Sequence, residues 1–262
     1  MGMNSLKWLA GLGCLALASP AVVADTVAID YVLDTAVASI DPFTVPNPQG
    51  GADITVAPSI SFETGLFGAE FSNADSAGVI ADGDASIIGL ELDGAVTIEL
   101  SSSIDVFGFP VPVTATISGP LTASQQTSST GTITGLQIYA ETSPGEYDLS
   151  AGPLECADSA LGVFCAAIET ALGGELPSGS LGGSTPLPFA GGTFEDLNPG
   201  SGSPPSSVSA QIDFTFPLAD EINFGVEIES DWIEVGRVLL IPEPSVTLLA
   251  LLAGAMCLVR RR

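Results

Sequence analysis

A regular alternation of apolar and polar residues is the feature that most constrains the fold of this chain. It is clearest over residues 208–216, where every second side chain is apolar: Ala210, Ile212, Phe214 and Phe216. Residues 222–229 show the same alternation. A helix repeats every 3.6 residues and would mix the two kinds of side chain, whereas a half-buried antiparallel strand separates them onto two faces. The chain is therefore predicted to be all-β.

Further strands are predicted where short apolar stretches are bounded by Gly, Ser, Pro or Asp. They cover residues 27–33, 53–56, 103–107, 113–117, 132–140 and 232–241. The strongest hairpin signal is Asp93-Gly94 between two alternating stretches, because Asp-Gly accepts the positive φ angles of a type I′ turn. Many short strands separated by turns favour an antiparallel β-sandwich or jelly roll.

One segment departs from this pattern. Residues 154–172 have the composition and apolar spacing of a helix, and they contain Cys156 and Cys165. In a straight helix these cysteines would lie about 13 Å apart, too far for a disulfide. We expect a disulfide in an oxidising compartment, which requires a bend that Gly162 could provide; two free thiols are the alternative. The expected fold thus includes one short helical, disulfide-linked insert.

Residues 175–207 are rich in Gly, Pro and Ser. A stretch of this composition and length is expected to be a long loop, either functional or disordered, and we favour disorder. The body of the protein is predicted to be one extracellular β domain over residues 25–241 that carries this loop.

The charge balance of that body is strongly negative. Residues 25–241 contain 30 acidic residues and a single basic one, Arg237, a difference of −29, and the chain has no histidine. Such a surface repels phosphate backbones and anionic lipids, so no nucleic-acid partner is expected, and it attracts cations. We expect most of the carboxylates to solvate the outer faces of strands.

The first 24 residues have the layout of a signal peptide. Lys7 precedes an apolar run over residues 8–18, and small residues at Val22 and Ala24 precede Asp25. This layout predicts an N-terminal signal helix that is cleaved after Ala24, and hence an exported protein.

The chain ends in three elements. Pro242-Glu243-Pro244 is a stiff motif, residues 245–259 are uncharged and mainly apolar, and Arg260, Arg261 and Arg262 follow. As a helix, the apolar run would be roughly 22 Å long against a hydrocarbon core of about 30 Å, so it predicts a weak anchor. Arginines prefer the cytoplasmic side, which leaves the body outside.

This tail resembles the PEP-CTERM sorting signal of exported proteins in Gram-negative bacteria. The resemblance is confined to residues 242–262, where the motif, the short transmembrane helix and the basic cluster occur in order. It implies processing near the motif by an exosortase, a membrane enzyme resembling cysteine proteases, after transient contact of the helix with the inner membrane. Members of that family commonly accompany extracellular polysaccharide and biofilm production. A permanent tail anchor is the alternative.

The residue inventory excludes several chemistries. Without histidine there is no Ser-His-Asp or Cys-His catalysis and no His-ligated zinc. A carboxylate pair of the glycosidase kind stays open, but nothing singles out two of the acids. We expect no catalytic residue and no cofactor.

A weak Ca²⁺ site is the one metal possibility. Asn73, Asp75, Gly78 and Asp84 match positions of an EF-hand loop, but Ala77 removes a ligand and no helices are expected on either side. The turn Asp82-Gly83-Asp84 could hold Ca²⁺ weakly; a plain turn is the favoured interpretation.

These observations favour a non-enzymatic, exported surface or extracellular-matrix protein. An exosortase-type protease and extracellular polysaccharide are its expected partners. One alternative is a carbohydrate- or Ca²⁺-binding module, although sugar platforms need exposed aromatic rings and the body offers few: Trp232, Tyr31, Tyr139 and Tyr147 beside its phenylalanines. The other alternative is a secreted glycosidase.

Overall fold

The structure is a computed structural model that describes residues 25–40, 42–45, 53–106, 109–158, 165–166, 184–189, 191–219 and 222–240. Nearly all of them lie in antiparallel β-strands, which confirms the all-β prediction. In chain order the strands are β1 (Asp25–Ile40), β2 (Phe43–Val45), β3 (Ile54–Ala74), β4 (Gly83–Ile87), β5 (Glu91–Val106), β6 (Phe109–Thr127), β7 (Ser129–Thr134), β8 (Ile138–Ser143), β9 (Gly145–Ala151), β10 (Glu155–Asp158), β11 (Ser184–Leu187), β12 (Thr193–Glu195), β13 (Ser207–Ala219) and β14 (Ile222–Leu240).

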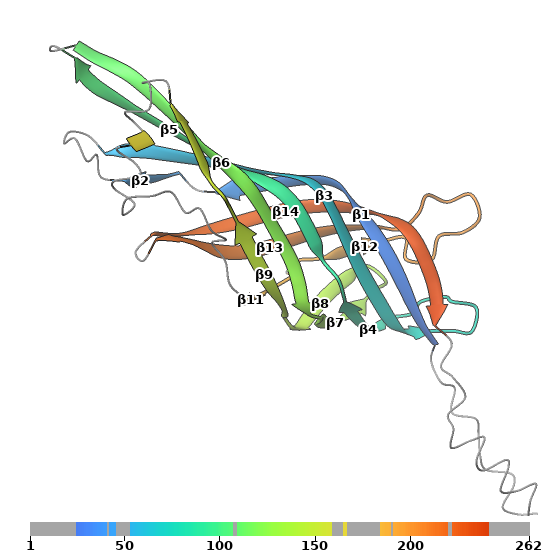
Figure 1. The fold of residues 1–262 in the computed structure, drawn as a ribbon. Helices are drawn as coiled ribbons and strands as arrows, with labels where there is room; N and C mark the ends of the chain where they lie inside the picture. Colours follow the sequence, from blue (N-terminus) through green and yellow to red (C-terminus); the bar gives the residue numbers. More distant parts are fainter. Residues whose placement is uncertain are drawn as a thin grey trace, which may run out of the picture.

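At one end of the molecule the sheet closes on itself. The path of paired strands runs β1-β14-β13-β12-β8-β7-β4-β3, and β3 pairs again with β1. Residues 25–32 of β1 therefore have a strand on each edge, β3 on one and β14 on the other. Figure 1 shows these three long strands side by side. A closed ring leaves no strand edge open at this end.

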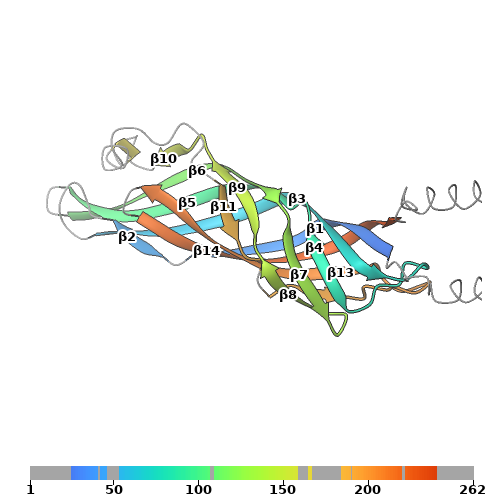
Figure 2. The ribbon, with the colours of Figure 1, turned by 90° about the horizontal axis from the view of Figure 1, so that it is seen from below.

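At the other end the strands separate into two layers. Beyond Val32, β1 stays with β14 but leaves β3, and β3 pairs instead with β5. One layer is then β13-β14-β1, and the other contains β3, β5, β6 and β9. The result is sandwich-like, with the β5–β6 hairpin projecting away from the end where β1 begins (Figures 1 and 2).

The side chain of Gln125 fills an interruption where the closed end meets the open end. β4 ends at Ile87 and β5 begins at Glu91, so backbone groups around residues 88–90 have no partner in a β-ladder. Gln125 Oε1 accepts the N–H groups of Gly89 (2.6 Å) and Leu90 (3.0 Å), and its Nε2 donates to the carbonyl of Ile87 at 2.8 Å. One buried amide thus replaces three ladder interactions.

The predicted hairpin at Asp93-Gly94 is wrong, because β5 runs straight through it. Gly94 lies opposite Phe62, where β3 carries a bulge, and a Cβ on Gly94 would lie 2.3 Å from the carbonyl oxygen of Ser61. The glycine therefore allows two backbones to approach closely instead of making a turn. The type I′ geometry occurs at Gly135 and Leu136, with φ angles of 63° and 56°.

That turn divides another predicted strand. Residues 132–140 form the β7–β8 hairpin instead of one strand, and the two strands predicted over 222–229 and 232–241 are parts of the single strand β14. Both errors concern connections, since the predicted residues that the structure describes are extended except for the turn residues 135–137.

The helical insert is also corrected where the structure describes it. Residues 155–158 are the strand β10, which pairs with 115–118 of β6, so pairing with an existing strand overrides the helical composition. In the segment predicted to be a disordered loop, residues 184–187 and 193–195 are strands β11 and β12. Most of the rest of residues 159–183 lies outside the described residues.

Aromatic rings fill the interior of the closed end. Trp232 is fully buried and packs edge-on against Phe67 at 5.4 Å between ring centroids. Tyr31 stacks on the other side of this cluster against Phe67 at 4.9 Å. Phe189 and Phe194, from the segment predicted to be disordered, complete the cluster and are 1% and 0% exposed. This segment therefore supplies part of the core.

Candidate functional site

The predicted sorting residues lie outside the described residues. These are Ala24 at the signal cleavage site, Pro242, Glu243 and Pro244 of the motif, and Arg260, Arg261 and Arg262. The described chain begins and ends next to them, and Thr26 of β1 lies directly opposite Leu240 of β14. Across the described ranges, none of the helical residues forms a segment long and apolar enough to span a membrane.

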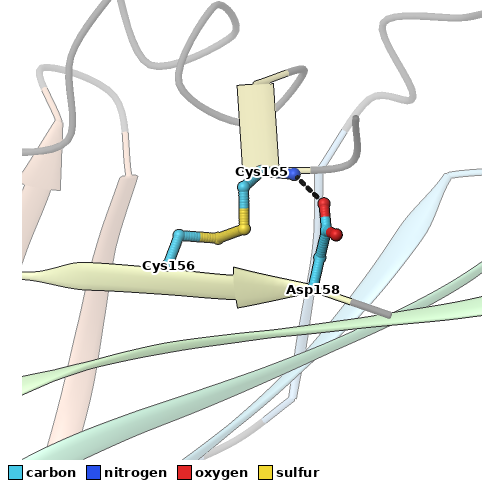
Figure 3. The surroundings of a disulfide bond; sticks show 3 residues. All are labelled: Cys156, Asp158 and Cys165. Atoms are coloured by element: carbon cyan, nitrogen blue, oxygen red, sulfur yellow. Dashed lines mark hydrogen bonds between the residues drawn. A yellow bond between two sulfur atoms is a disulfide. The ribbon is translucent and has the colours of Figure 1, made fainter. Parts of the chain in front are cut away.

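Cys156 and Cys165 are joined by a disulfide with a Cα–Cα distance of 5.8 Å. Cys156 lies in β10 and Cys165 in a short helical turn, so the two cysteines come from different elements. Asp158 accepts the backbone N–H of Cys165 at 2.7 Å, as Figure 3 shows. The disulfide and this hydrogen bond together attach residue 165 to the sheet through β10.

The carboxylates of the Ca²⁺ candidate already hold backbone groups. Asp82 accepts the N–H groups of Gly135 (2.9 Å) and Leu136 (2.7 Å), and so supports the type I′ turn of the β7–β8 hairpin. Asp75 accepts those of Ala77 (2.8 Å) and Val79 (2.9 Å) in its own loop. No cluster of three potential ligands occurs in the described ranges. The arrangement favours a structural turn.

A chain of polar side chains crosses the edge of the aromatic cluster at β1 and β14. The hydroxyl of Tyr31 is 3.1 Å from Ser206 Oγ, which donates to Glu234, and Arg237 forms a two-pronged ion pair with Glu234 at 2.7 and 2.9 Å. Arg237 also donates to the carbonyl of Leu197 at 2.7 Å. The one basic residue of the body therefore ties β14 to the segment before β13.

The ionisation of this chain follows from its contacts. Burial alone would raise the pKa of Glu234, but hydrogen bonds from Arg237 and Ser206 outweigh it and lower that pKa. Burial raises the pKa of Tyr31 well above its ordinary range. At neutral pH the group is thus an ionised Glu–Arg pair next to a neutral tyrosine.

A second chain of the same type lies at β7 and β8. The hydroxyl of Tyr139 is 3.1 Å from Ser129 Oγ, and Ser129 donates to Glu141. Glu141 also accepts the N–H of Phe189 at 3.1 Å. Burial raises the pKa of Tyr139 to about 12. Nearby, the hydroxyl of Tyr147 is buried without a hydrogen-bond partner in the structure.

Sequence analysis did not single out these serine and glutamate residues. One weak signal is available, because Tyr139 and Glu141 are two residues apart and so share a face of β8. The partners Ser129 and Ser206 carry no comparable signal. Ser206 meets Tyr31 only because segments 175 residues apart come together, whereas Ser129 meets Tyr139 within the β7–β8 hairpin.

The tryptophan and the three tyrosines considered for sugar binding are buried, whereas Phe109 at the tip of the β5–β6 hairpin is exposed. Trp232, Tyr31, Tyr139 and Tyr147 are at most 3% exposed. A sugar-stacking platform needs a ring face open to solvent, so these four rings cannot form one.

A depression of about 610 Å³ crosses four strands where the closed end meets the open end. It is lined by one segment from each of β1, β3, β5 and β6, namely residues 32–33, 63–66, 91–93 and 122–124. Three of its exposed side chains are the carboxylates Glu63, Glu91 and Asp93. Hydroxyl-bearing residues pair with two of them: Thr64 of β3 and Thr122 of β6 lie opposite Asp93, and Ser124 of β6 lies opposite Glu91. Most of the surface that lines the depression is apolar, and its three carboxylates make it negatively charged.

Comparisons with protein families, with curated proteins and with solved structures found no match.

Proposed function

We propose that this protein is an exported, non-enzymatic component of the bacterial surface or extracellular matrix, sorted through its Pro242-Glu243-Pro244 tail by an exosortase-type protease. The observation that carries the proposal is the order of sorting motif, short apolar run and arginine cluster at residues 242–262, after a signal peptide at residues 1–24.

The geometry of the body is compatible with this use. Because Thr26 is opposite Leu240, the chain enters and leaves the fold on neighbouring strands at one end. Pro242 is two residues beyond Leu240 and so within about 7 Å of the strand end. A body attached at this end to a membrane or matrix leaves its β5–β6 hairpin free at the other end.

Two finer aspects of the fold belong to the same proposal. We assign the open end to the β-sandwich class in preference to the jelly roll, because β13-β14-β1 forms one layer of consecutive antiparallel neighbours. The signal and tail segments are proposed to be helical during export, as their composition suggests.

The alternatives receive less support. A Ca²⁺ module would need free carboxylates, whereas Asp75 and Asp82 already accept backbone N–H groups. A carbohydrate module would need open aromatic rings in place of the buried ones. A glycosidase would need a pair of carboxyl groups on either side of a scissile bond, and no observation selects such a pair.

The test is the mass and location of the protein in the exporting cell. Intact-mass measurement should show a product that starts at Asp25 and has lost the arginine cluster. Replacing Pro242, Glu243 and Pro244 by alanine should retain the uncut tail and leave the protein in the inner membrane. A full-length mass for the wild-type protein, or unchanged location of the alanine variant, would contradict the proposal.

A further inference from the structure

One edge of β3 is paired at both ends of a long interval, with β1 at one end and with β2 at the other, but not within it. Leu66 of β3 pairs with Val32 of β1 on one edge and with Glu91 of β5 on the other, and β5 keeps to that second edge as far as Ser101 opposite Thr55. β2, which follows β1, pairs with β3 at residues 54–56. Because β5 occupies the second edge there, β2 lies on the same edge of β3 as β1.

Between these two paired regions lies an opening that we name the β1–β3 seam, formed by residues 33–40 of β1 and 57–65 of β3. In the described part of the chain, no strand pairs with either segment on the seam side. Alternate backbone N–H and C=O groups of an extended strand point to each edge, so both segments present hydrogen-bonding groups to the seam. The seam is about 30 Å long, at 3.3 Å per residue.

The β1 side of the seam has a bulge and the charged residue Asp34 at one end, but it otherwise lacks the features that usually protect a strand edge. Natural edge strands are short, or carry lysines or prolines. The strands β2, β10 and β11 have three or four residues each. By contrast, residues 35–40 form an extended stretch with no charge and no proline, and Val37 is 65% exposed. The β3 side carries Pro58, which has no N–H to donate. β1 is therefore the better edge for accepting another strand.

The depression described above lies at the closed end of this seam. Both segments contribute to it, Leu33 from β1 and residues 63–65 from β3. Of its carboxylates, Glu63 lies on β3 at the seam, whereas Glu91 and Asp93 lie one strand farther from β1, on β5. The body has only one basic residue, Arg237, and it is already paired with Glu234. The positive charge that complements these carboxylates must therefore come from another molecule.

We propose that the β1–β3 seam is a docking site for an extended, lysine- or arginine-bearing segment of another protein. The segment adds as a strand to residues 33–40 of β1 and places its basic side chains over Glu63, Glu91 and Asp93. Backbone hydrogen bonds supply affinity in this mode of recognition, and side chains supply specificity. A second copy of this chain is a poor occupant, because 30 acidic residues against one arginine would oppose the same carboxylates. The inference does not depend on how the tail is processed.

The probe is a synthetic, end-capped ten-residue peptide in which lysine alternates with valine and threonine. Two further peptides keep its side chains but carry N-methyl groups on the odd or on the even residues, which removes the N–H donors of one edge. Binding to the exported protein is measured by fluorescence anisotropy at near-physiological salt, where surface charges are screened beyond about 8 Å. The unmethylated peptide should bind, and at least one methylated peptide should bind about tenfold more weakly.

Two protein variants with equal loss of charge test the site. The triple variant E63Q/E91Q/D93N should weaken binding of the unmethylated peptide about tenfold. The control D148N/E155Q/E195Q changes exposed acids of β9, β10 and β12 and should bind within about twofold of wild type. Melting temperatures show whether both variants are folded. Absence of binding, equal binding of all three peptides, or equal weakening by both variants would overturn the proposal, the last two by showing attraction to the acidic surface in general.

Discussion

The carboxylate of Asp82 holds Leu136 in a left-handed backbone conformation. Leu136 donates its N–H to Asp82 at 2.7 Å and has a φ of 56°, which a branched side chain rarely adopts. The two residues lie 54 positions apart, in the loop before β4 and in the turn between β7 and β8. The acid considered for Ca²⁺ binding thus supports a strained turn.

Asp82→Ala should lower the free energy of unfolding by about 1–2 kcal/mol, because two N–H groups lose a charged acceptor. Chemical denaturation measures the effect. Asp84→Ala is a matched control, because Asp84 is an exposed residue of the adjacent strand, and it should change stability by less than about 0.5 kcal/mol. Addition of Ca²⁺ should leave the melting temperature of the wild-type protein unchanged, and a shift abolished by Asp82→Ala would revive the Ca²⁺ hypothesis.

Gln125→Leu should be the more damaging change. It leaves the two N–H groups of Gly89 and Leu90 and the carbonyl of Ile87 without their partner. A buried group left without a hydrogen bond destabilises the folded state by about 1–3 kcal/mol. A loss of at least about 2 kcal/mol in denaturation is expected. The adjacent Gln126 is exposed, so Gln126→Leu serves as the control, and equal effects of the two substitutions would contradict the bridging role.

Tyr139 and Tyr147 should respond differently to removal of the hydroxyl. Tyr139→Phe breaks the contact with Ser129 and should destabilise the protein by about 1 kcal/mol. Tyr147→Phe removes a buried hydroxyl that has no partner and should be neutral or stabilising. Thermal melts of the two variants make the comparison, and a destabilised Tyr147→Phe would show that its hydroxyl has a partner, such as a bound water.

The Glu234–Arg237 pair should make the free energy of unfolding depend on pH in the acidic range. The pKa of Glu234 is lower in the folded protein than in the unfolded chain, so its contribution is complete above the unfolded value of about 4.3 and is lost as pH falls through the folded value. Glu234→Gln should remove this part of the pH dependence and cost about 1 kcal/mol at pH 7, since the pair is partly exposed. Denaturation of both proteins from pH 7 to pH 2 checks the sign. Glu229→Gln, in the same strand, should leave the profile unchanged.

Local pattern predicted part of the strands, β13 among them, but not β4, β9 or most of β3. The alternation around Ala210 and Ile212 identifies the face that is buried in β13, because a period of two is a property of any extended chain. The hairpin predicted at Asp93-Gly94 was wrong because glycine allows close approach of two backbones as well as turns. Only the position of Phe62 in the neighbouring strand distinguishes the two uses.

Long-range pairing was not predictable in the same way. Cys156 lies in a strand because β6 offers an edge to residues 155–158, a condition that helical composition does not reveal. Phe189 and Phe194 are core residues in a stretch rich in Gly, Pro and Ser, and two rings in such surroundings show little periodicity. The contact between Tyr31 and Ser206 likewise forms only after distant segments have met.

The pairing of Thr26 with Leu240 also determines which strand is the last to complete the fold. The last strand of the sheet lies between β1 and β13, so the ring stays incomplete until β14 is available. Contacts this distant in sequence form late and slowly. In a chain synthesised from its N-terminus, this ring therefore closes only after β14 has been made, when the other strands of the sheet are already available.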